Sequence, residues 1–294
     1  MPRRTDGRER RGAPRVFVLG AGKAGTALAH ALRAQGAATQ LRPARKGLPR
    51  AIDADVIVLA VRDRDLAPLA RKMREVGVVP VQAVVLHVAG ALGAEPLAAL
   101  RSACAGVGQM HPMISFATPR RAPDLARGNM HVEGDPQAVA RARTLARLLG
   151  MTPRTVPHLD HIAYHAAAGL VANGAAALAA VGAELLVRAG VARDVAPKML
   201  GPLLRSVAEN VERLGFPGAL TGPVRRGDVA GLEKHLATLR AKLPEAVTLY
   251  LAAAQAQLPL ARAIAEAPPA SFDAIESSLA AATSPSGMAR RTPS

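Results

Sequence analysis

The sequence predicts an α/β domain built on a parallel sheet, followed by an all-α domain. Between residues 15 and 156, short apolar segments alternate with longer segments of helical period, as expected for the strands and helices of a parallel sheet. After Pro157 this alternation stops and the pattern is helical. A glycine motif at the end of the first apolar segment indicates that the α/β domain is of the Rossmann type.

The first strand is expected over 15–20, and it runs directly into a glycine-rich turn that opens a helix over 23–35. The motif consists of Gly20, Ala21, Gly22, Lys23, Ala24 and Gly25. Gly20 permits the tight turn, Gly22 lets the backbone approach a pyrophosphate, and Gly25 lets the helix pack against the sheet. The helix N-terminus presents free N–H groups to the phosphates. The strand before and the helix after favour dinucleotide binding over a plain glycine turn.

The rest of the α/β domain is expected to alternate in the same way. The continuous apolar run 55–61 indicates a strand that is buried on both faces. The other expected strands cover 37–42, 83–88, 106–110, 129–133 and 152–156. The expected helices cover 65–76, 94–101 and 136–149.

The second domain is predicted to consist of helices alone. These are expected at 159–189, 194–214, 228–241, 244–266 and 271–282. Asp194, Asp228 and Ser271 stand at three of the expected starts and have side chains that cap a helix N-terminus well.

Four segments are predicted along the chain. They are a basic arm over 1–13, a Rossmann-like domain over 14–156, a helical substrate or dimerisation domain over 157–283, and a tail over 284–294. The arm and the tail are expected to be disordered. The net charge is +16, and arginines crowd both ends. A protein that reads nucleic acid also needs aromatic side chains to stack on bases, and this chain has no Trp, two Tyr and four Phe. We therefore expect a solvated basic surface and no nucleic-acid partner.

Cysteine use and hydropathy indicate a cytoplasmic protein. Cys104 is the only cysteine, so no disulfide forms within the chain, which suits a reducing compartment. Residues 1–13 lack the apolar segment of a secretory signal. The nearly uncharged run 162–183 is long enough to span a membrane, but it is mostly Ala and Gly and carries His165 and Asn173. We expect a helix buried against another helix, and no membrane partner.

The end of the second expected strand indicates the coenzyme. NAD-binding motifs place a carboxylate there for the ribose 2′-hydroxyl, whereas this chain has Arg42, Arg45 and Lys46. Because arginine binds a phosphate through two hydrogen bonds, the sequence predicts NADP over NAD. The alternative is that these cations belong to a generally basic surface. Val61, the last residue of the expected strand 55–61, and Asp63, just past it, are expected to line the coenzyme cleft, although Asp63 equally fits a surface loop.

The expected catalytic residues follow from the chemistry of hydride transfer. His111 stands at the carboxyl end of an expected strand, where a doubly wound sheet binds ligands, and it is predicted to donate the proton that the reduced group needs. A hydrogen-bonded loop histidine is the alternative. His165 and Asn173 are eight residues apart on one helix face and are expected to orient the reacting group, unless neighbouring helices satisfy them. We expect Ser115 and Arg226 to bind substrate, and no metal.

Several segments occur in an order that resembles a known family. They are Leu19–Gly25, His87–Leu92, His111–Phe116, Tyr164–Asn173, and Thr221–Asp228 with His235. Together they resemble oxidoreductases that join a Rossmann-like domain to a helical domain of unknown function 2520. That family is similar in plan to ketopantoate reductase, pyrroline-5-carboxylate reductase, prephenate dehydrogenase and 6-phosphogluconate dehydrogenase. The resemblance implies an NAD(P)-dependent oxidoreductase that forms a homodimer through its helical domain.

The resemblance implies a substrate contact for His111, and the chain also departs from the family. Val88-Ala89 stands where hydroxyl residues usually precede Gly90, and histidines replace the lysine that some of these enzymes use on the equivalent helix. The sequence therefore predicts an NADP-dependent oxidoreductase for a small, carboxylate-bearing 2-oxo or 2-hydroxy acid or an imine, without naming the substrate. The alternatives are a non-catalytic NAD(P)-binding regulatory protein and a nucleic-acid-associated protein that acts through its basic arm.

Overall fold

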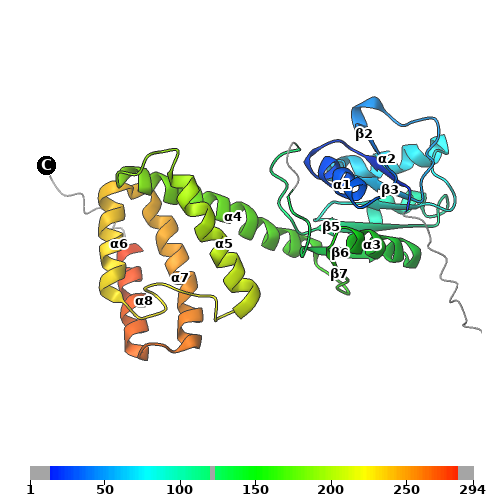
Figure 1. Ribbon diagram of the computed structural model, residues 1–294. Coiled ribbons are helices and arrows are strands. Elements are labelled where there is room, and N and C mark those ends of the chain that lie inside the picture. Colours follow the sequence, from blue (N-terminus) through cyan, green and yellow to red (C-terminus); the bar gives the residue numbers. More distant parts are fainter. Residues whose placement is uncertain (1–13, 120–122, 284–294) are drawn as a thin grey trace, which may run out of the picture. The chain divides into compact units, whose positions relative to one another are not determined.

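The computed structural model describes residues 14–119 and 123–283 (Figure 1). The arm and the tail that the sequence predicts to be disordered lie outside the described residues. The chain divides into two compact units, Met1–Ala172 and Asn173–Ser294. The division falls within one long helix, α4 (His161–Arg188), later than the boundary expected before residue 157.

The first unit is built on a seven-stranded sheet. In spatial order its strands are β2 (Thr39–Arg42), β1 (Val16–Leu19), β3 (Val56–Leu59), β4 (Val84–His87), β5 (Gly106–Pro112), β6 (Asn129–Gly134) and β7 (Thr152–Arg154). Neighbouring strands are parallel except β5 and β6, which are antiparallel. The sheet is therefore mainly parallel, as predicted, with this one antiparallel pair. The connection between the two strands has no helix over its described residues, and a parallel pair needs such a crossover.

Helices cover both faces of this sheet (Figure 1). On β1, Val16 and Val18 point into the core beneath α1 (Lys23–Ala34) and α3 (Pro136–Leu148). Phe17 and Leu19 point into the opposite core, beneath α2 (Asp63–Val76) and the 3₁₀ helix η2 (Glu95–Leu100). Successive strand residues face opposite sides, so a strand covered on both sides is apolar throughout. This arrangement confirms the predicted α/β class.

The second unit is helical, as predicted. Its helices are the end of α4, α5 (Ala196–Leu214), α6 (Val229–Lys242), α7 (Val247–Ile264) and α8 (Pro269–Thr283), and its core lies among α6, α7 and α8. Asp228 caps α6 by accepting a hydrogen bond from the Gly231 N–H at 2.8 Å, which confirms one predicted cap.

The other two predicted caps are wrong. The N-cap of α5 is Val195, and Asp194 instead pairs with Lys198 at 3.0 Å. Ser271 lies inside α8, which already begins at Pro269. Proline fits the first turn of a helix because its missing N–H is not needed there, so it moves the start ahead of the serine.

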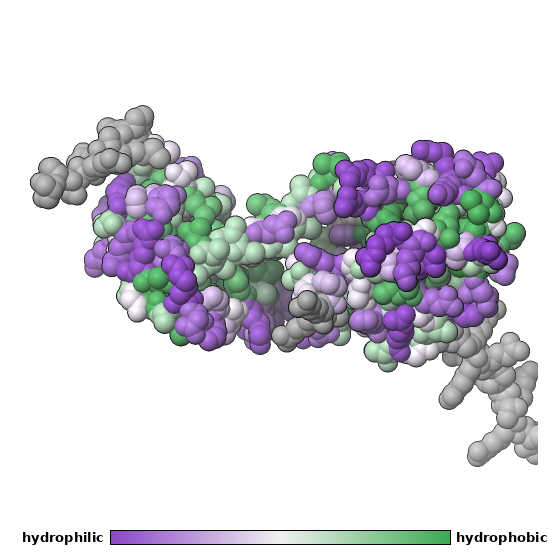
Figure 2. All heavy atoms as spheres, turned by 90° about the horizontal axis from the view of Figure 1, so that it is seen from above, coloured by the Kyte–Doolittle hydropathy of each residue, from purple (hydrophilic) through white to green (hydrophobic). Residues whose placement is uncertain are grey.

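Helix α4 is the one helix in the described part of the chain that is long and apolar enough to cross a membrane by length and composition. The sequence predicts that it is buried against another helix, yet none of its residues is buried within the chain. On α5 only Ala196 is buried. Large apolar side chains are therefore exposed on both helices. These side chains are Ile162, Leu170, Val171 and Leu178 on α4, and Met199, Leu203, Leu204, Val207 and Leu214 on α5. Figure 2 shows hydrophobic residues, in green, at the surface of the molecule among the hydrophilic ones.

Candidate functional site: a glycine turn and a histidine-lined cavity

The glycine turn between β1 and α1 borders a cavity of about 590 Å³. Gly20 has φ +121°, and a Cβ there would lie 2.1 Å from the Ala60 carbonyl oxygen. A Cβ on Gly25 would lie 1.9 Å from the Gly20 carbonyl oxygen. A Cβ on Gly22 would meet nothing within 4 Å, so this glycine faces open space. Two of the three glycines are therefore required by the fold, and the third is free to serve a ligand.

The N-terminus of α1 points to the same turn. Gly22 is its N-cap, and no side chain caps the helix. The first N–H groups of a helix have no partner within it, and together with the helix dipole they attract an anion. The cavity is lined by Gly20, Ala21, Gly22, Pro43, Ala44, Arg45, Ala60, Val61, Arg62, Asp65 and Leu69.

The three cations predicted for the 2′-phosphate have different positions. Arg45 lines the cavity, whereas Arg42 and Lys46 do not. The Arg42 guanidinium donates to the carbonyl oxygens of Gly47 at 2.7 Å and Lys46 at 2.8 Å, so it holds the loop that carries Arg45. Arg62, which sequence reasoning missed, also lines the cavity. The sequence could have indicated Arg62, because it follows β3 at the carboxyl edge of the sheet, where such folds bind ligands.

A second cavity, of about 380 Å³, adjoins the first and shares Gly22, Ala60, Val61 and Arg62 with it. Its further lining residues are Lys23, Ala24, Asp63, Val88, Ala89, Gly90, His111, Pro112, Ile114, Phe116 and His165. All of these lie in the first unit. The fold thus brings the predicted Asp63, His111 and His165 together with the glycine turn.

The residues predicted to contact the substrate include three that line neither cavity, Ser115, Asn173 and Arg226. Ser115 is exposed on the loop after His111, although its neighbours on both sides line the second cavity. Asn173 and Arg226 are exposed and belong to the second unit. Their predicted roles stay predictions.

His111 and His165 converge beside Gly90. A Cβ on Gly90 would lie 2.6 Å from His111 Nε2 and 2.6 Å from His165 Nδ1, so only glycine leaves both rings where they are. The other ring nitrogen of His111, Nδ1, lies 3.0 Å from the Tyr164 hydroxyl. When Tyr164 donates to Nδ1, the imidazole proton is on Nε2, beside the cavity.

The surroundings of His111 decide its charge. Burial first, and then the nearby histidines led by His165, lower the pKa of His111 to about 4. The imidazole is therefore neutral at pH 7 and can donate a hydrogen bond from one nitrogen only. Burial also raises the pKa of the Tyr164 hydroxyl, which remains protonated.

Buried polar side chains hold the loop between β4 and η2, which forms one wall of the second cavity. His87 Nε2 lies 2.7 Å from the Gly93 carbonyl oxygen, and Gln109 Nε2 donates to the Ala89 carbonyl oxygen at 2.9 Å. His131 Nδ1 lies 2.8 Å from Gln109 Oε1. Sequence reasoning missed these residues, although each is a polar residue within a segment expected to be a strand. A buried polar group needs a partner, and here the partners are one another and the loop.

Comparison with known proteins agrees with this architecture. Residues 129–257 match the family described as "Domain of unknown function (DUF2520)". The DUF2520 region begins at β6 and ends within α7, so it includes both the start of α4 and most of the helical unit. No curated protein matches the chain.

Solved structures share the fold at low identity. A "putative NADP oxidoreductase" from Bacteroides fragilis is 22% identical, with a TM-score of 0.65 over 83% of this chain and 98% of that one. A protein from Thermotoga maritima is 20% identical, with a TM-score of 0.62 over 84% and 98%. Pyrroline carboxylate reductase from Plasmodium falciparum, with NADP bound, is 13% identical, with a TM-score of 0.56 over 83% and 98%. These similarities show the Rossmann-like fold with its helical region.

Proposed function

We propose that this chain is an NADP-dependent oxidoreductase that transfers hydride to or from a small, carboxylate-bearing 2-oxo or 2-hydroxy acid or an imine. The observation that carries the proposal is the pair of adjoining cavities. One borders the glycine turn and the uncapped start of α1, and the other is lined by His111 and His165. A dinucleotide needs a phosphate site and a reaction site in continuous space, and the shared lining residues provide it.

The residues of the first cavity fit the coenzyme. Gly22 leaves its Cβ direction open, and the N–H groups at the start of α1 would bind the pyrophosphate. Arg45 and Arg62 would bind the 2′-phosphate, because guanidinium groups match phosphate oxygens. When bound, the nicotinamide supplies or accepts the hydride.

His111 would hold the heteroatom of the reacting group as a neutral hydrogen-bond donor. With a pKa of about 4, the His111 imidazole is neutral at pH 7, and its predicted role as proton donor to the reduced group stays a prediction. The Nε2–H of a neutral ring still polarises a C=O or C=N bond as negative charge develops on the heteroatom. Tyr164 would fix this tautomer by donating its hydroxyl proton to Nδ1. Lys23 lines the second cavity and not the first, and it would bind a substrate carboxylate.

Coenzyme binding tests the proposal. Isothermal titration of the full chain with NADPH and NADH should show tighter binding of NADPH. Arg45→Ala should weaken NADPH binding at least ~10-fold with little effect on NADH, as expected for loss of one phosphate contact of ~1.4 kcal/mol or more. The matched control is Arg50→Ala, because Arg50 is exposed and lines neither cavity. If Arg45→Ala and Arg50→Ala changed NADPH affinity equally, Arg45 would belong to a generally basic surface and not to a 2′-phosphate site.

Turnover separates an enzyme from a binding protein. NADPH oxidation should occur with at least one member of a panel of 2-oxo acids and cyclic imines. Tight NADPH binding without oxidation of any member would favour the second candidate, a non-catalytic regulatory protein on the same fold.

We also propose that the exposed apolar faces of α4 and α5 pair with a second copy of this chain. Met199, Leu203 and Val207 repeat at helical spacing on α5 and are exposed, and an apolar stripe of this kind is normally covered in a folded protein. Light scattering should give the mass of a dimer, and Leu203→Glu should give a monomer. The control is Val81→Glu, at an exposed apolar position of the first unit. A monomeric wild-type chain would refute the pairing.

A further inference from the structure

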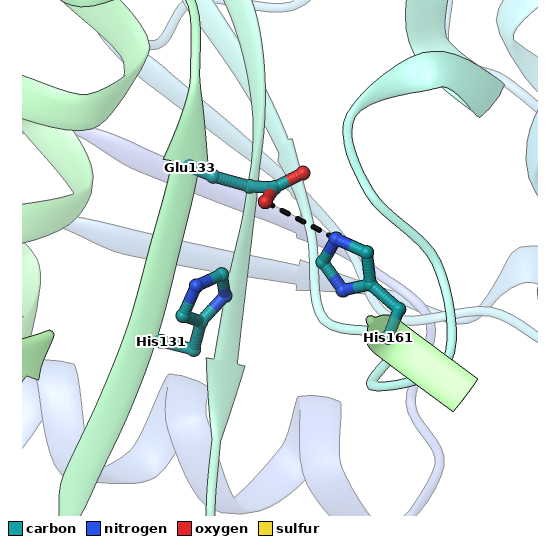
Figure 3. A group of neighbouring side chains, drawn as sticks. All are labelled: His131, Glu133 and His161. Atoms are coloured by element: carbon teal, nitrogen blue, oxygen red, sulfur yellow. Dashed lines mark hydrogen bonds and ion pairs between the residues drawn. The ribbon is translucent and has the colours of Figure 1, made fainter. Parts of the chain in front are cut away.

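Three side chains that the proposed reaction does not use form a cluster at the start of α4. His131 and Glu133 come from β6, and His161 is the first residue of α4 (Figure 3). Their potential ligand atoms all lie within 4.8 Å of one another. His131 is buried and the other two are partly buried. All three belong to the first unit, and none lines either cavity described above.

The donor set and the spacing suit a zinc ion. Zinc is commonly bound by imidazole nitrogens and carboxylate oxygens at about 2.0–2.2 Å, so neighbouring ligand atoms of a tetrahedral site lie about 3.3 Å apart. His161 Nε2 and Glu133 Oε2 are 3.1 Å apart, joined by a hydrogen bond (Figure 3). An ion would replace the proton between them, and the His131 ring would approach to complete the set.

The surrounding groups orient two of the three ligands. Gln109 donates through its Nε2 to the Ala89 carbonyl oxygen, so its Oε1 accepts the proton on His131 Nδ1 at 2.8 Å. This leaves the lone pair of His131 on Nε2, which accepts a long hydrogen bond of 3.5 Å from the Val156 N–H, and an ion would take the place of this contact. Glu133 Oε1 accepts from the Ala94 N–H at 3.2 Å. Metal-binding histidines and carboxylates are characteristically held by such second hydrogen bonds.

The cluster also has an unsatisfied atom and a glycine packed against it. His161 Nδ1 is buried without a hydrogen-bond partner among the described residues, so its ring is not fully satisfied by Glu133 alone. Gly93 lies over the cluster. A Cβ on Gly93 would lie 2.5 Å from Glu133 Oε1 and 3.2 Å from His161 Nε2, so only glycine at this position leaves both ligand groups where they are.

We propose that His131, Glu133 and His161 bind one divalent transition-metal ion, with zinc preferred and a fourth position left for water. The ion would tie β6 to the first turn of α4, and the same turn carries Tyr164 and His165 toward the second cavity. Its role would be to position these two side chains, and it would not touch the substrate. The proposal departs from the sequence-based prediction of no metal, because the fold brings together side chains from two segments that are distant in the sequence.

Metal binding to the untagged full chain tests this proposal, independently of coenzyme binding. After removal of metal with a chelator, titration with Zn²⁺ should show one saturable site per chain, and Zn²⁺ should raise the melting temperature. Glu133→Gln and His161→Asn should each weaken Zn²⁺ at least ~10-fold and abolish the thermal shift. Glu133→Gln keeps an oxygen that can accept from Ala94. The control is His30→Asn, because His30 is exposed on α1, outside the cluster.

Two results would overturn the site. One is a wild-type chain without a saturable site, and the other is Zn²⁺ binding that survives both cluster substitutions while depending on His30. Circular dichroism of the metal-free variants checks that they fold. If they do not, the Co²⁺ spectrum of the wild-type chain decides the question. Intense visible bands of four- or five-coordinate Co²⁺ support the site, and the weak spectrum of the six-coordinate aqueous ion refutes it.

Discussion

Replacing Gly22 with alanine should separate coenzyme binding from folding. Gly22 has φ −77° and ψ −170°, a conformation that alanine adopts readily, and its added Cβ would meet nothing within 4 Å. Gly22→Ala should therefore change the free energy of unfolding by no more than about 1 kcal/mol, because alanine restricts the unfolded chain but is a poorer N-cap than glycine. The same Cβ would stand where the proposed pyrophosphate approaches the backbone. NADPH binding should weaken at least ~100-fold, or about 2.7 kcal/mol.

The assay pairs urea denaturation with calorimetric titration of NADPH. Gly25→Ala is the contrasting variant, since its Cβ would lie 1.9 Å from the Gly20 carbonyl oxygen and should cost about 1–3 kcal/mol of stability. Gly174→Ala is the matched control, because that glycine also has open space and lies in the second unit. If Gly22→Ala bound NADPH as tightly as the wild-type chain, the open space at Gly22 would not be a phosphate site, and the reasoning behind the coenzyme assignment would fail.

Three further predictions follow from the site and the caps. The pKa of His111 is about 4 in the folded chain, below the unfolded value of 6.5. His111 should therefore contribute up to about 3 kcal/mol of stability above pH 6.5, and this contribution should be lost as the pH falls toward 4. In a series of denaturation curves over this pH range, His111→Gln should lose less stability than the wild-type chain. Gly90→Ala should lower turnover more than NADPH affinity, since its Cβ would displace His111 and His165. Steady-state kinetics and calorimetric titration of one preparation measure the two quantities. Unchanged turnover would contradict the shared role of the two rings. Asp228→Ala should cost about 1 kcal/mol in a urea melt, with NADPH affinity unchanged, and a neutral result would mean that the cap contributes nothing.

The sequence alone predicts those parts of the fold that depend on a single local pattern of residues. The Gly20–Gly25 turn has a strand before it and a helix after it, and backbone sterics at Gly20 and Gly25 allow little else. The apolar run around β3 predicts a strand covered on both faces, because strand residues alternate between the two cores. Helical period likewise predicted every helix of the second unit, though Pro269 moved one start.

Only the tertiary structure decided relations between distant segments. Periodicity within a strand carries no information on the direction of its neighbour, so the antiparallel pairing of β5 with β6 was not predictable from either strand alone. The same pairing places His131 opposite His111 and Glu133 opposite Gln109, and α4 then adds His161 to the group. The Arg42 guanidinium donates to carbonyl oxygens of the loop that follows β2, whereas Arg45 of the same loop lines the first cavity. Local sequence thus determined the scaffold and the phosphate turn, whereas strand register and loop closure determined which side chains meet, because those contacts join residues far apart in the chain.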